Sequence, residues 1–277
     1  MTMSLSPYLT DALATFVAGR SPGHPVLVAS DFDGVLSPLV DDPSASAPTP
    51  EASEALGRLA ALPGTEVRLA LVSGRDLKTL ATLSRAPLGT ELVGSHGAER
   101  GVVVGTVGGD GGDEPASTTV EGHPFALTDD ERGRLDAVRS GLEAIARDAE
   151  GAWVEDKPSA AVLHTRRAEP DRAAPAGDAA RALGAQHDAH TMTGKDVVEI
   201  AVVDTSKGVA LVRLRDELDA AAVLYLGDDV TDERAFEALS PTDVTVKVGP
   251  GETVARFRVE SVEDAALVLA EVARLLS

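Results

Sequence analysis

"VLVASDFDGVLSPLVDD", residues 26–42, is the stretch that decides the fold of this chain. An apolar run of Val, Leu and Ala ends abruptly at Asp31 and Asp33, and Gly34 follows them. Such a run is typical of a parallel strand buried on both faces, and ligands of open α/β sheets bind beyond the carboxyl ends of these strands. Asp and Gly are also ordinary turn residues, so this stretch alone leaves a simple turn as an alternative.

Similar apolar runs recur along the chain and predict the rest of a sheet. Together with residues 25–30, the predicted strands cover residues 67–72, 91–94, 222–227 and 244–248. Helical patterns cover residues 49–62, 76–84, 206–219, 231–239 and 262–276. This alternation predicts an α/β fold with a doubly wound, Rossmann-like parallel sheet.

The middle of the chain breaks the alternation. Residues 105–124 are glycine-rich and acidic, which predicts either a mobile connection or the tip of an exposed hairpin. A helical pattern, the strands "AWVEDK" and "AAVLHTR", a second helix and the strand "DVVEIAVV" follow. We expect an inserted α+β cap domain at 126–203, between the two parts of a core domain at 1–125 and 204–277. Trp153 is expected in the core of the insertion, with stacking on a sugar as the alternative.

Composition excludes several classes of protein. The net charge of −20 over 277 residues argues against a nucleic-acid binder or a membrane-surface binder. The absence of cysteine excludes disulfides, thiolate chemistry and cysteine-ligated zinc. The first twenty residues lack a basic segment and predict a short amphipathic helix instead of a signal peptide, and no apolar run is long enough to span a bilayer. We expect a cytoplasmic monomer.

A second acidic strand end lies in "VLYLGDDVTDERAF", residues 223–236. Asp228 and Asp229 follow the strand, and Asp232 lies on the first turn of the next helix. Helix capping and the helix dipole are simpler explanations for these residues. Two acidic strand ends nevertheless favour a metal site, and ligands that are all oxygen favour Mg²⁺.

Two further stretches carry groups that bind phosphate. "LALVSGRD", residues 69–76, places Ser73, Gly74 and Arg75 at a strand end before a helix, where an anion can bind, although Ser73 could simply cap that helix. Lys207 lies at another helix start, where a cation is unfavourable unless an anion is bound. Carboxylates, a hydroxyl and an ammonium group together predict phosphoryl transfer through a carboxylate.

These motifs resemble, in their order along the chain, those of the haloacid dehalogenase-like phosphatase superfamily. They are "DFDGV", "VSGR", Lys207 in "SKG", and "GDDVTDE". The stretches "VGSHGAER", "WVEDKPSAAVLHTR" and "GKDVVEI" are similar to signatures of the trehalose-6-phosphate phosphatases. The chain departs from that family at "EIAVVDTSKG", where Arg-Pro often follows Glu-Ile.

The resemblance implies an Mg²⁺-dependent phosphatase that converts trehalose 6-phosphate to trehalose and inorganic phosphate. Asp31 would attack phosphorus, and Asp33 would act as general acid and then as general base. Ser73 and Lys207 would hold the phosphoryl group. The Mg²⁺ ligands would be Asp31, the Asp33 carbonyl and Asp228, supported by Asp229 and Asp232.

The resemblance also assigns residues to substrate binding, namely Gly74, Arg75, His96, Glu155, Lys157, Arg166, Lys195 and Glu199. Period-two alternation independently places Glu155 and Lys157 on one face of a strand, where an exposed ion pair is the simpler explanation. His96 could be a structural histidine. The alternatives for the whole chain are a phosphatase for sucrose 6-phosphate or mannosyl-3-phosphoglycerate, and a non-catalytic sugar-phosphate sensor.

Overall fold

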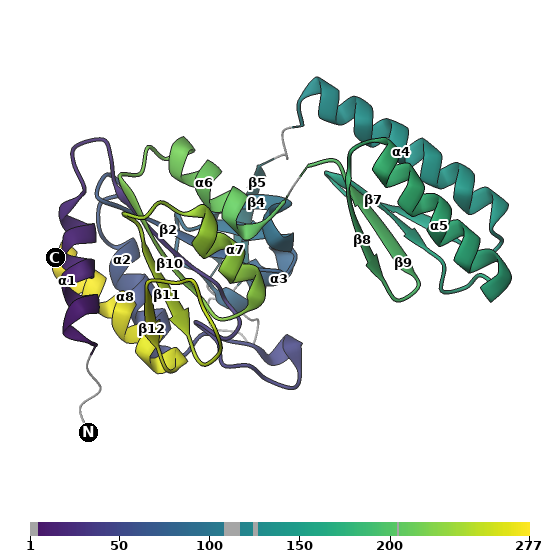
Figure 1. Cartoon of the computed structure of the whole chain (residues 1–277). Coiled ribbons are helices and arrows are strands. Elements are labelled where there is room, and N and C mark those ends of the chain that lie inside the picture. Colours follow the sequence, from purple (N-terminus) through teal and green to yellow (C-terminus); the bar gives the residue numbers. More distant parts are fainter. Residues whose placement is uncertain (1–4, 108–116, 124–126, 204) are drawn as a thin grey trace. The chain divides into compact units, whose positions relative to one another are not determined.

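The computed structural model describes residues 5–107, 117–123, 127–203 and 205–277. The chain forms two compact units (Figure 1). The first unit comprises Met1–His123 and Ser206–Ser277, and the second comprises Pro124–Thr205. No helix in the described ranges has both the length and the apolar character needed to cross a bilayer.

The first unit contains an eight-stranded sheet in the order β12-β11-β10-β1-β2-β3-β4-β5. Its strands are β1 (Val26–Ser30), β2 (Val67–Val72), β3 (Glu91–Gly94), β4 (Glu99–Val107), β5 (Ser117–His123), β10 (Ala222–Gly227), β11 (Val244–Val248) and β12 (Phe257–Val259). Pairing is parallel from β12 to β3, and antiparallel where β4 and β5 extend one edge. The predicted α/β fold and its parallel strands are confirmed.

Helices cover both faces of this sheet. They are α1 (Pro7–Ala18), α2 (Pro50–Ala60), α3 (Leu77–Ser84), α6 (Lys207–Glu217), α7 (Val230–Ala238) and α8 (Val262–Leu276), and η1 (Pro43–Ala45) and η2 (Ser95–Gly97) are short 3₁₀ turns. Alternate residues of β1 enter different cores. Val26 and Val28 pack in the cluster that includes α2 and α8, whereas Leu27 and Ala29 pack in the cluster that includes α6 and α7. Burial on both faces explains the unbroken apolar run of the sequence.

The glycine-rich stretch at 105–124 forms part of a hairpin. Residues 105–107 end β4, residues 117–123 form β5, and Val107 pairs with Ser117. The described residues thus form paired strands, while the predicted tip, residues 108–116, and residue 124 lie outside the described residues. The β-branched residues of "STTV" explain why a polar stretch still forms a strand.

The second unit is a four-stranded antiparallel sheet with two helices on one face. Its elements are α4 (Asp129–Asp148), β6 (Trp153–Asp156), β7 (Ala160–His164), α5 (Pro170–Gln186), β8 (His190–Gly194) and β9 (Val197–Ala201), and the strand order is β6-β7-β9-β8. Leu142 of α4 packs with Leu163 and Ile200 of the sheet.

Trp153 is an exception to the sequence prediction. It is 36% exposed and lies on the face of the second unit's sheet away from the helices, because its neighbour Val154 packs toward them. The expectation that Trp153 belongs to the core of the insertion is therefore wrong.

Chain connections place one end of the first unit's sheet at a switch point. From β1 the chain continues to β2 on one side, and from β10 it continues to β11 on the other. Ligands of open α/β sheets bind beyond the carboxyl ends of strands at such a point. Asp31 follows β1 and Asp228 follows β10, so both acidic strand ends of the sequence meet there.

Candidate active site

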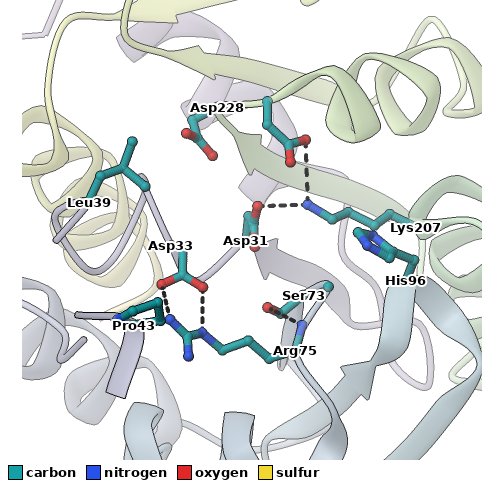
Figure 2. A pocket seen from close by; sticks show the side chains of 11 residues that line it. Asp31, Asp33, Leu39, Pro43, Ser73, Arg75, His96, Lys207 and Asp228 are labelled. Carbon is teal, nitrogen blue, oxygen red and sulfur yellow. Dashed lines mark hydrogen bonds and ion pairs between the residues drawn. The ribbon is translucent and has the colours of Figure 1, made fainter. Parts of the chain in front are cut away.

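A buried ion pair lies at the centre of the site. Lys207 Nζ lies 2.7 Å from Asp31 Oδ2 (Figure 2). It also lies 2.8 Å from Asp232 Oδ1, and the exposed fractions are 5% for Asp31 and 2% for Lys207. The Phe32 amide donates to Asp31 Oδ1 at 2.6 Å. Lys207 begins α6, as the sequence predicts, and the carboxylates offset the unfavourable helix dipole at that position.

Burial and charge act on this pair in opposite directions. Burial raises the pKa of the Asp31 carboxyl well above its ordinary value, and Lys207 opposes the rise. Burial alone would lower the pKa of Lys207, but the attraction of Asp31 and Asp232 outweighs it and raises that pKa. Lys207 therefore remains a cation, which favours the ionised form of Asp31.

Asp232 is fully buried and all its acceptor positions are in use. Lys207 Nζ and the Tyr225 hydroxyl donate to Oδ1, the latter at 2.6 Å. The amides of Asp228 and Asp229 donate to Oδ2 at 2.8 and 3.0 Å. A carboxylate has about four lone-pair sites, so Asp232 is already saturated by its protein partners.

Asp229 caps helix α7. Its Oδ1 accepts hydrogen bonds from the amides of Thr231 at 2.7 Å and Asp232 at 3.0 Å. The capping explanation from the sequence is thus confirmed for Asp229, although its Oδ1 also lies 3.8 Å from Lys207 Nζ. Burial alone would raise the pKa of Asp229, but Lys207 and the hydrogen bonds from Thr231 lower it overall.

Three carboxylates could hold a divalent cation. Oxygen atoms of Asp31, Asp228 and Asp232 lie within 4.8 Å of one another. Burial, and then repulsion by Asp232 and Asp229, raises the pKa of Asp228 to about 6. Among the described residues, none donates a hydrogen bond to the Asp228 carboxylate, in contrast to Asp232. The Asp228 carboxylate is thus the uncompensated member of this cluster, and a hard cation that prefers oxygen ligands would compensate it.

The backbone around Asp228 is shaped to admit its carboxylate. Gly34 has φ +74°, and a Cβ there would lie 2.1 Å from Asp228 Oδ2. On the other side, Lys247 donates from Nζ to the Asp228 carbonyl and lies 3.5 Å from Glu233 Oε1. Only glycine at position 34 leaves this space, since the conformation also disfavours other residues.

Arg75 and Ser46 hold the carboxylate of Asp33. The Arg75 guanidinium donates from Nε to Oδ2 at 2.6 Å and from Nη2 to Oδ1 at 2.8 Å (Figure 2). The Ser46 hydroxyl donates to Oδ1 at 3.1 Å and accepts from Arg75 Nη2 at 2.9 Å. The hydrogen bond to Asp33 raises the pKa of Arg75. Bidentate pairing of this kind fixes the orientation of a carboxylate.

Ser73 does not cap the following helix, because α3 begins at Leu77 and Asp76 is its N-cap. Ser73 instead accepts a hydrogen bond from the Arg75 amide at 3.2 Å, and only 1% of it is exposed. At Gly74, a Cβ would lie 2.6 Å from His96 Cε1, so the turn and the imidazole pack closely.

The structure gathers the predicted residues of the first unit around one pocket. The pocket has a volume of about 540 Å³. It is lined by Asp31, Asp33, Leu39, Pro43, Ser73, Gly74, Arg75, His96, Lys207, Asp228 and Asp229. Asp232 is the one predicted residue of this unit that lies buried beside the pocket instead of lining it. An anion in the pocket would meet the cationic side chains of Lys207 and Arg75.

The predicted residues of the second unit form a less compact group. Glu155, Val162 and Glu199 are cross-strand neighbours on the face without helices. Lys157 Nζ lies 2.6 Å from Glu199 Oε2, and His164 Nε2 lies 2.7 Å from Glu155 Oε2. Carboxylates and an ammonium group on one face suit the hydroxyls of a sugar.

Trp153 contacts this group, whereas Arg166 and Lys195 lie apart from it. The Trp153 ring stacks on His164 with 4.7 Å between ring centres. Arg166 borders a separate cavity of about 530 Å³ beside α5, and Lys195 is exposed in the turn between β8 and β9. The described structure therefore does not bring these two cations together with Lys157.

Sequence reasoning missed three polar residues that contact the site residues, as well as Leu39 and Pro43, which line the pocket. Lys247 had a usable signal, because a lysine inside the apolar strand "VTVKV" is rarely buried without a partner. Tyr225 is hidden in the apolar strand before Asp228, and Ser46 lies in a polar loop where nothing distinguishes it from its neighbours.

The fold and the site agree with one class of protein. A carboxylate after the first sheet strand, a buried lysine and a second acidic strand end lie where the motifs of the haloacid dehalogenase-like fold predict them. The sequence pattern of the trehalose-phosphatase family matches residues 29–267, and the chain belongs to this family.

Individual relatives agree with the family match. Trehalose-phosphate phosphatase of Mycobacterium marinum is 35% identical over 267 residues, which cover 91% of this chain and 63% of that protein. A bifunctional trehalose-6-phosphate synthase/phosphatase of Thermoproteus tenax is 35% identical over 84% of this chain and 30% of its own length. The solved Aspergillus fumigatus trehalose-6-phosphate phosphatase has a TM-score of 0.69 at 24% identity, covering 99% of each chain, and shows the same fold. The chain thus spans less than two thirds of these curated relatives.

Proposed function

We propose that this chain hydrolyses trehalose 6-phosphate to trehalose and inorganic phosphate through an aspartyl-phosphate intermediate on Asp31. The observation that carries the proposal is the buried Asp31–Lys207 pair in a pocket that Asp33, Ser73 and Asp228 also line. The match to the trehalose-phosphatase family supports the choice of trehalose 6-phosphate as the substrate.

The first step forms the phosphoenzyme. An Asp31 oxygen attacks phosphorus, and the bond between phosphorus and the sugar oxygen breaks. Asp33 gives its proton to that oxygen, so the sugar leaves as a neutral alcohol. Lys207 and Ser73 stabilise the charge on the phosphoryl oxygens, and Lys207 also keeps Asp31 oriented by its 2.7 Å contact.

The second step regenerates the enzyme. Asp33, now ionised, takes a proton from a water molecule whose oxygen attacks phosphorus. The bond between phosphorus and the Asp31 oxygen breaks, phosphate leaves, and the Asp31 carboxylate is restored. Asp33 is suited to both steps because it lines the same pocket as Asp31, and its side chain is held by Arg75.

Mg²⁺ is the cation that these ligands favour. Asp31, the carbonyl of Asp33 and Asp228 would hold it, because the Asp232 oxygens are saturated by Lys207, Tyr225 and two amides. Asp229 and Asp232 would support these ligands from the start of α7. When bound, Mg²⁺ supplies positive charge to the phosphoryl oxygens.

The second unit acts, in this proposal, as the cap that recognises the sugar. Glu155, Lys157 and Glu199 present acceptors and donors for hydroxyl groups on one sheet face. Arg166 and Lys195 would add donors from the neighbouring loops, and His96, Gly74 and Arg75 would contact the substrate from the first unit.

The experiment that tests the function is phosphate release from a panel of esters. The panel holds trehalose 6-phosphate, sucrose 6-phosphate, glucose 6-phosphate and mannosyl-3-phosphoglycerate, each with Mg²⁺ and with a chelator. We expect Mg²⁺-dependent release mainly from trehalose 6-phosphate, and none from the Asp31→Asn variant, which serves as the blank.

Each other result contradicts a different part of the proposal. Equal activity across the panel would overturn the role of the second unit but keep the Asp31 chemistry. Full activity with the chelator would overturn the Mg²⁺ requirement. Tight binding of trehalose 6-phosphate without turnover would indicate a sensor.

A further inference from the structure

Ser46 is a buried hydroxyl that directly follows an exposed segment of a loop. The loop joins β1 to α2, and residues 38–45 are exposed, whereas Ser46 is only 4% exposed. The preceding turn η1 is capped by Asp42, whose Oδ1 accepts from the Ser44 amide at 2.9 Å. A polar side chain that is buried in this way needs hydrogen-bond partners.

Both partners of Ser46 belong to the proposed acid/base machinery. Its Oγ lies 3.1 Å from Asp33 Oδ1 and 2.9 Å from Arg75 Nη2, while Arg75 itself holds both oxygens of Asp33. The three side chains close a ring of hydrogen bonds. Rotation of the Asp33 carboxyl therefore breaks contacts with two partners at once.

The two partners differ in how they respond to the charge of Asp33. The hydrogen bonds from Arg75 to Asp33 are charge-assisted. They therefore weaken when Asp33 carries the proton that it gives to the leaving group. A hydroxyl can donate to a carboxylate or to the carbonyl oxygen of a neutral carboxyl. The Ser46 hydrogen bond therefore depends less on the charge of Asp33 than the Arg75 hydrogen bonds do.

We propose that Ser46 is a positioning residue that, through its hydrogen bonds to Asp33 and Arg75, keeps the Asp33 carboxyl aligned with the leaving oxygen. The inference rests on the proposed function, in which Asp33 is the general acid. Its consequence is specific: loss of Ser46 should slow only those substrates whose leaving group needs a proton.

The test compares two leaving groups in the full chain with Mg²⁺. The Ser46→Ala variant should lose about tenfold in kcat/KM for trehalose 6-phosphate, since general acid catalysis is worth about 10²–10⁴. It should lose less than about twofold for p-nitrophenyl phosphate, because p-nitrophenolate leaves without protonation. The parameter kcat/KM reports only the steps up to phosphoenzyme formation, where Asp33 acts as acid.

Two further variants serve as controls. Ser53→Ala makes the same change at an exposed position of α2 and should match wild type on both substrates. Ser46→Cys keeps the volume with a weak donor and should show a smaller selective loss, which provides a second measurement if the alanine variant unfolds.

Equal losses on both substrates, or no loss on the sugar phosphate, would overturn the inference. If wild type hydrolyses p-nitrophenyl phosphate and another sugar phosphate but not trehalose 6-phosphate, the proposed substrate is wrong. The Ser46 comparison is then made with that alkyl ester. Absence of turnover with every ester would overturn both the proposed function and the role of Ser46.

Discussion

Asp228 and Asp232 lie four positions apart, and their surroundings give them different tasks. Asp232 accepts from Lys207, Tyr225 and two amides, so its charge is compensated without any added ion. Asp228 faces the pocket, and burial together with the nearby carboxylates raises its pKa to about 6. Asp232, whose negative charge is compensated by protein donors, therefore has a structural role, whereas the uncompensated Asp228 is the better candidate ligand for a cation.

Replacing Asp228 by Asn should stabilise the metal-free protein at pH 7.5 by about 1 kcal/mol, after allowance for solvent screening of a partly exposed group. The protonated Asp228 carboxyl stabilises the fold below its ordinary pKa of 3.8, and this contribution is lost as pH rises through about 6. The difference in the free energy of unfolding between the variant and the wild type should therefore be smaller at about pH 4 than at pH 7.5. Urea unfolding with a chelator at the two pH values measures it.

The neighbouring residue provides a control of opposite sign. Burial alone would raise the pKa of Asp229, but Lys207 and its bonds to Thr231 lower it, so its ionised form stabilises the fold. Asp229→Asn should lose stability at pH 7.5. An Asp228→Asn protein that is no more stable than wild type at that pH contradicts the argument.

At the scale of single elements, the turn after β1 determines whether the site can form. Gly34 has φ +74° and lies against the Asp228 carboxylate that follows β10. Two strand ends can approach this closely only because one of them carries no side chain at the point of contact.

Gly34→Ala should weaken Mg²⁺ binding by at least about tenfold, because its Cβ would lie 2.1 Å from Asp228 Oδ2. Calorimetric titration of Mg²⁺ measures the affinity without any substrate. Gly89→Ala is the matched control, since Gly89 has φ +81° with no atom within 4 Å of the added Cβ. Both variants should lose about 1 kcal/mol or more of stability from backbone strain. Only Gly34→Ala should lose Mg²⁺ affinity, and an unchanged Mg²⁺ affinity of this variant would refute the steric argument.

On the sheet of the second unit, Glu199→Gln should raise KM for trehalose 6-phosphate by about tenfold and leave p-nitrophenyl phosphate unaffected. The change removes the ion pair with Lys157 at 2.6 Å and one charged acceptor for a sugar hydroxyl. Asp156→Asn is the control, because Asp156 lies on β6 and pairs with Arg139 of α4 on the helix side. An equal rise in KM for both esters would mean that Glu199 does not distinguish the sugar.

The accuracy of sequence-based prediction differed between elements for a physical reason. Strands buried on both faces, such as β1 and β10, show continuous apolar runs and were predicted with nearly correct ends. The strand β8, "HTMTG", is mostly exposed and carries no apolar alternation, so it was missed.

The same difference applies to the site. Carboxylates at strand ends are visible in sequence because the apolar run stops there. Ser46 and the saturation of Asp232 depend on contacts between distant segments, and no local pattern encodes those contacts. Roles of individual site residues remain predictions.

At the scale of the whole molecule, charge opposes the proposed substrate. The chain carries a net charge of −20, whereas a phosphate monoester is an anion. Lys207 and Arg75 provide positive charge within the pocket, but the field further out repels the ester before these cations can act.

Added salt should therefore increase kcat/KM for trehalose 6-phosphate, by about twofold between about 20 and 150 mM KCl at saturating Mg²⁺, because the Debye length shortens to about 8 Å. Steady-state kinetics over a KCl series measures the effect. Glucose in place of KCl controls for solution changes that are not ionic. A decrease with salt would mean that the local cations dominate the long-range field.

The central strand pairing has a consequence for synthesis. β1 pairs with β10, and the paired residues Val26 and Ala222 are separated by most of the sequence. A ribosome therefore releases β1 long before β10 exists, and at about 5–20 residues per second the incomplete sheet waits for roughly ten seconds or more. During that interval the backbone N–H and C=O groups along one edge of β1 lack their native partner and are open to pairing with other strands. The two acidic strand ends of the site can come together only late in synthesis, when residues 222–227 insert beside β1.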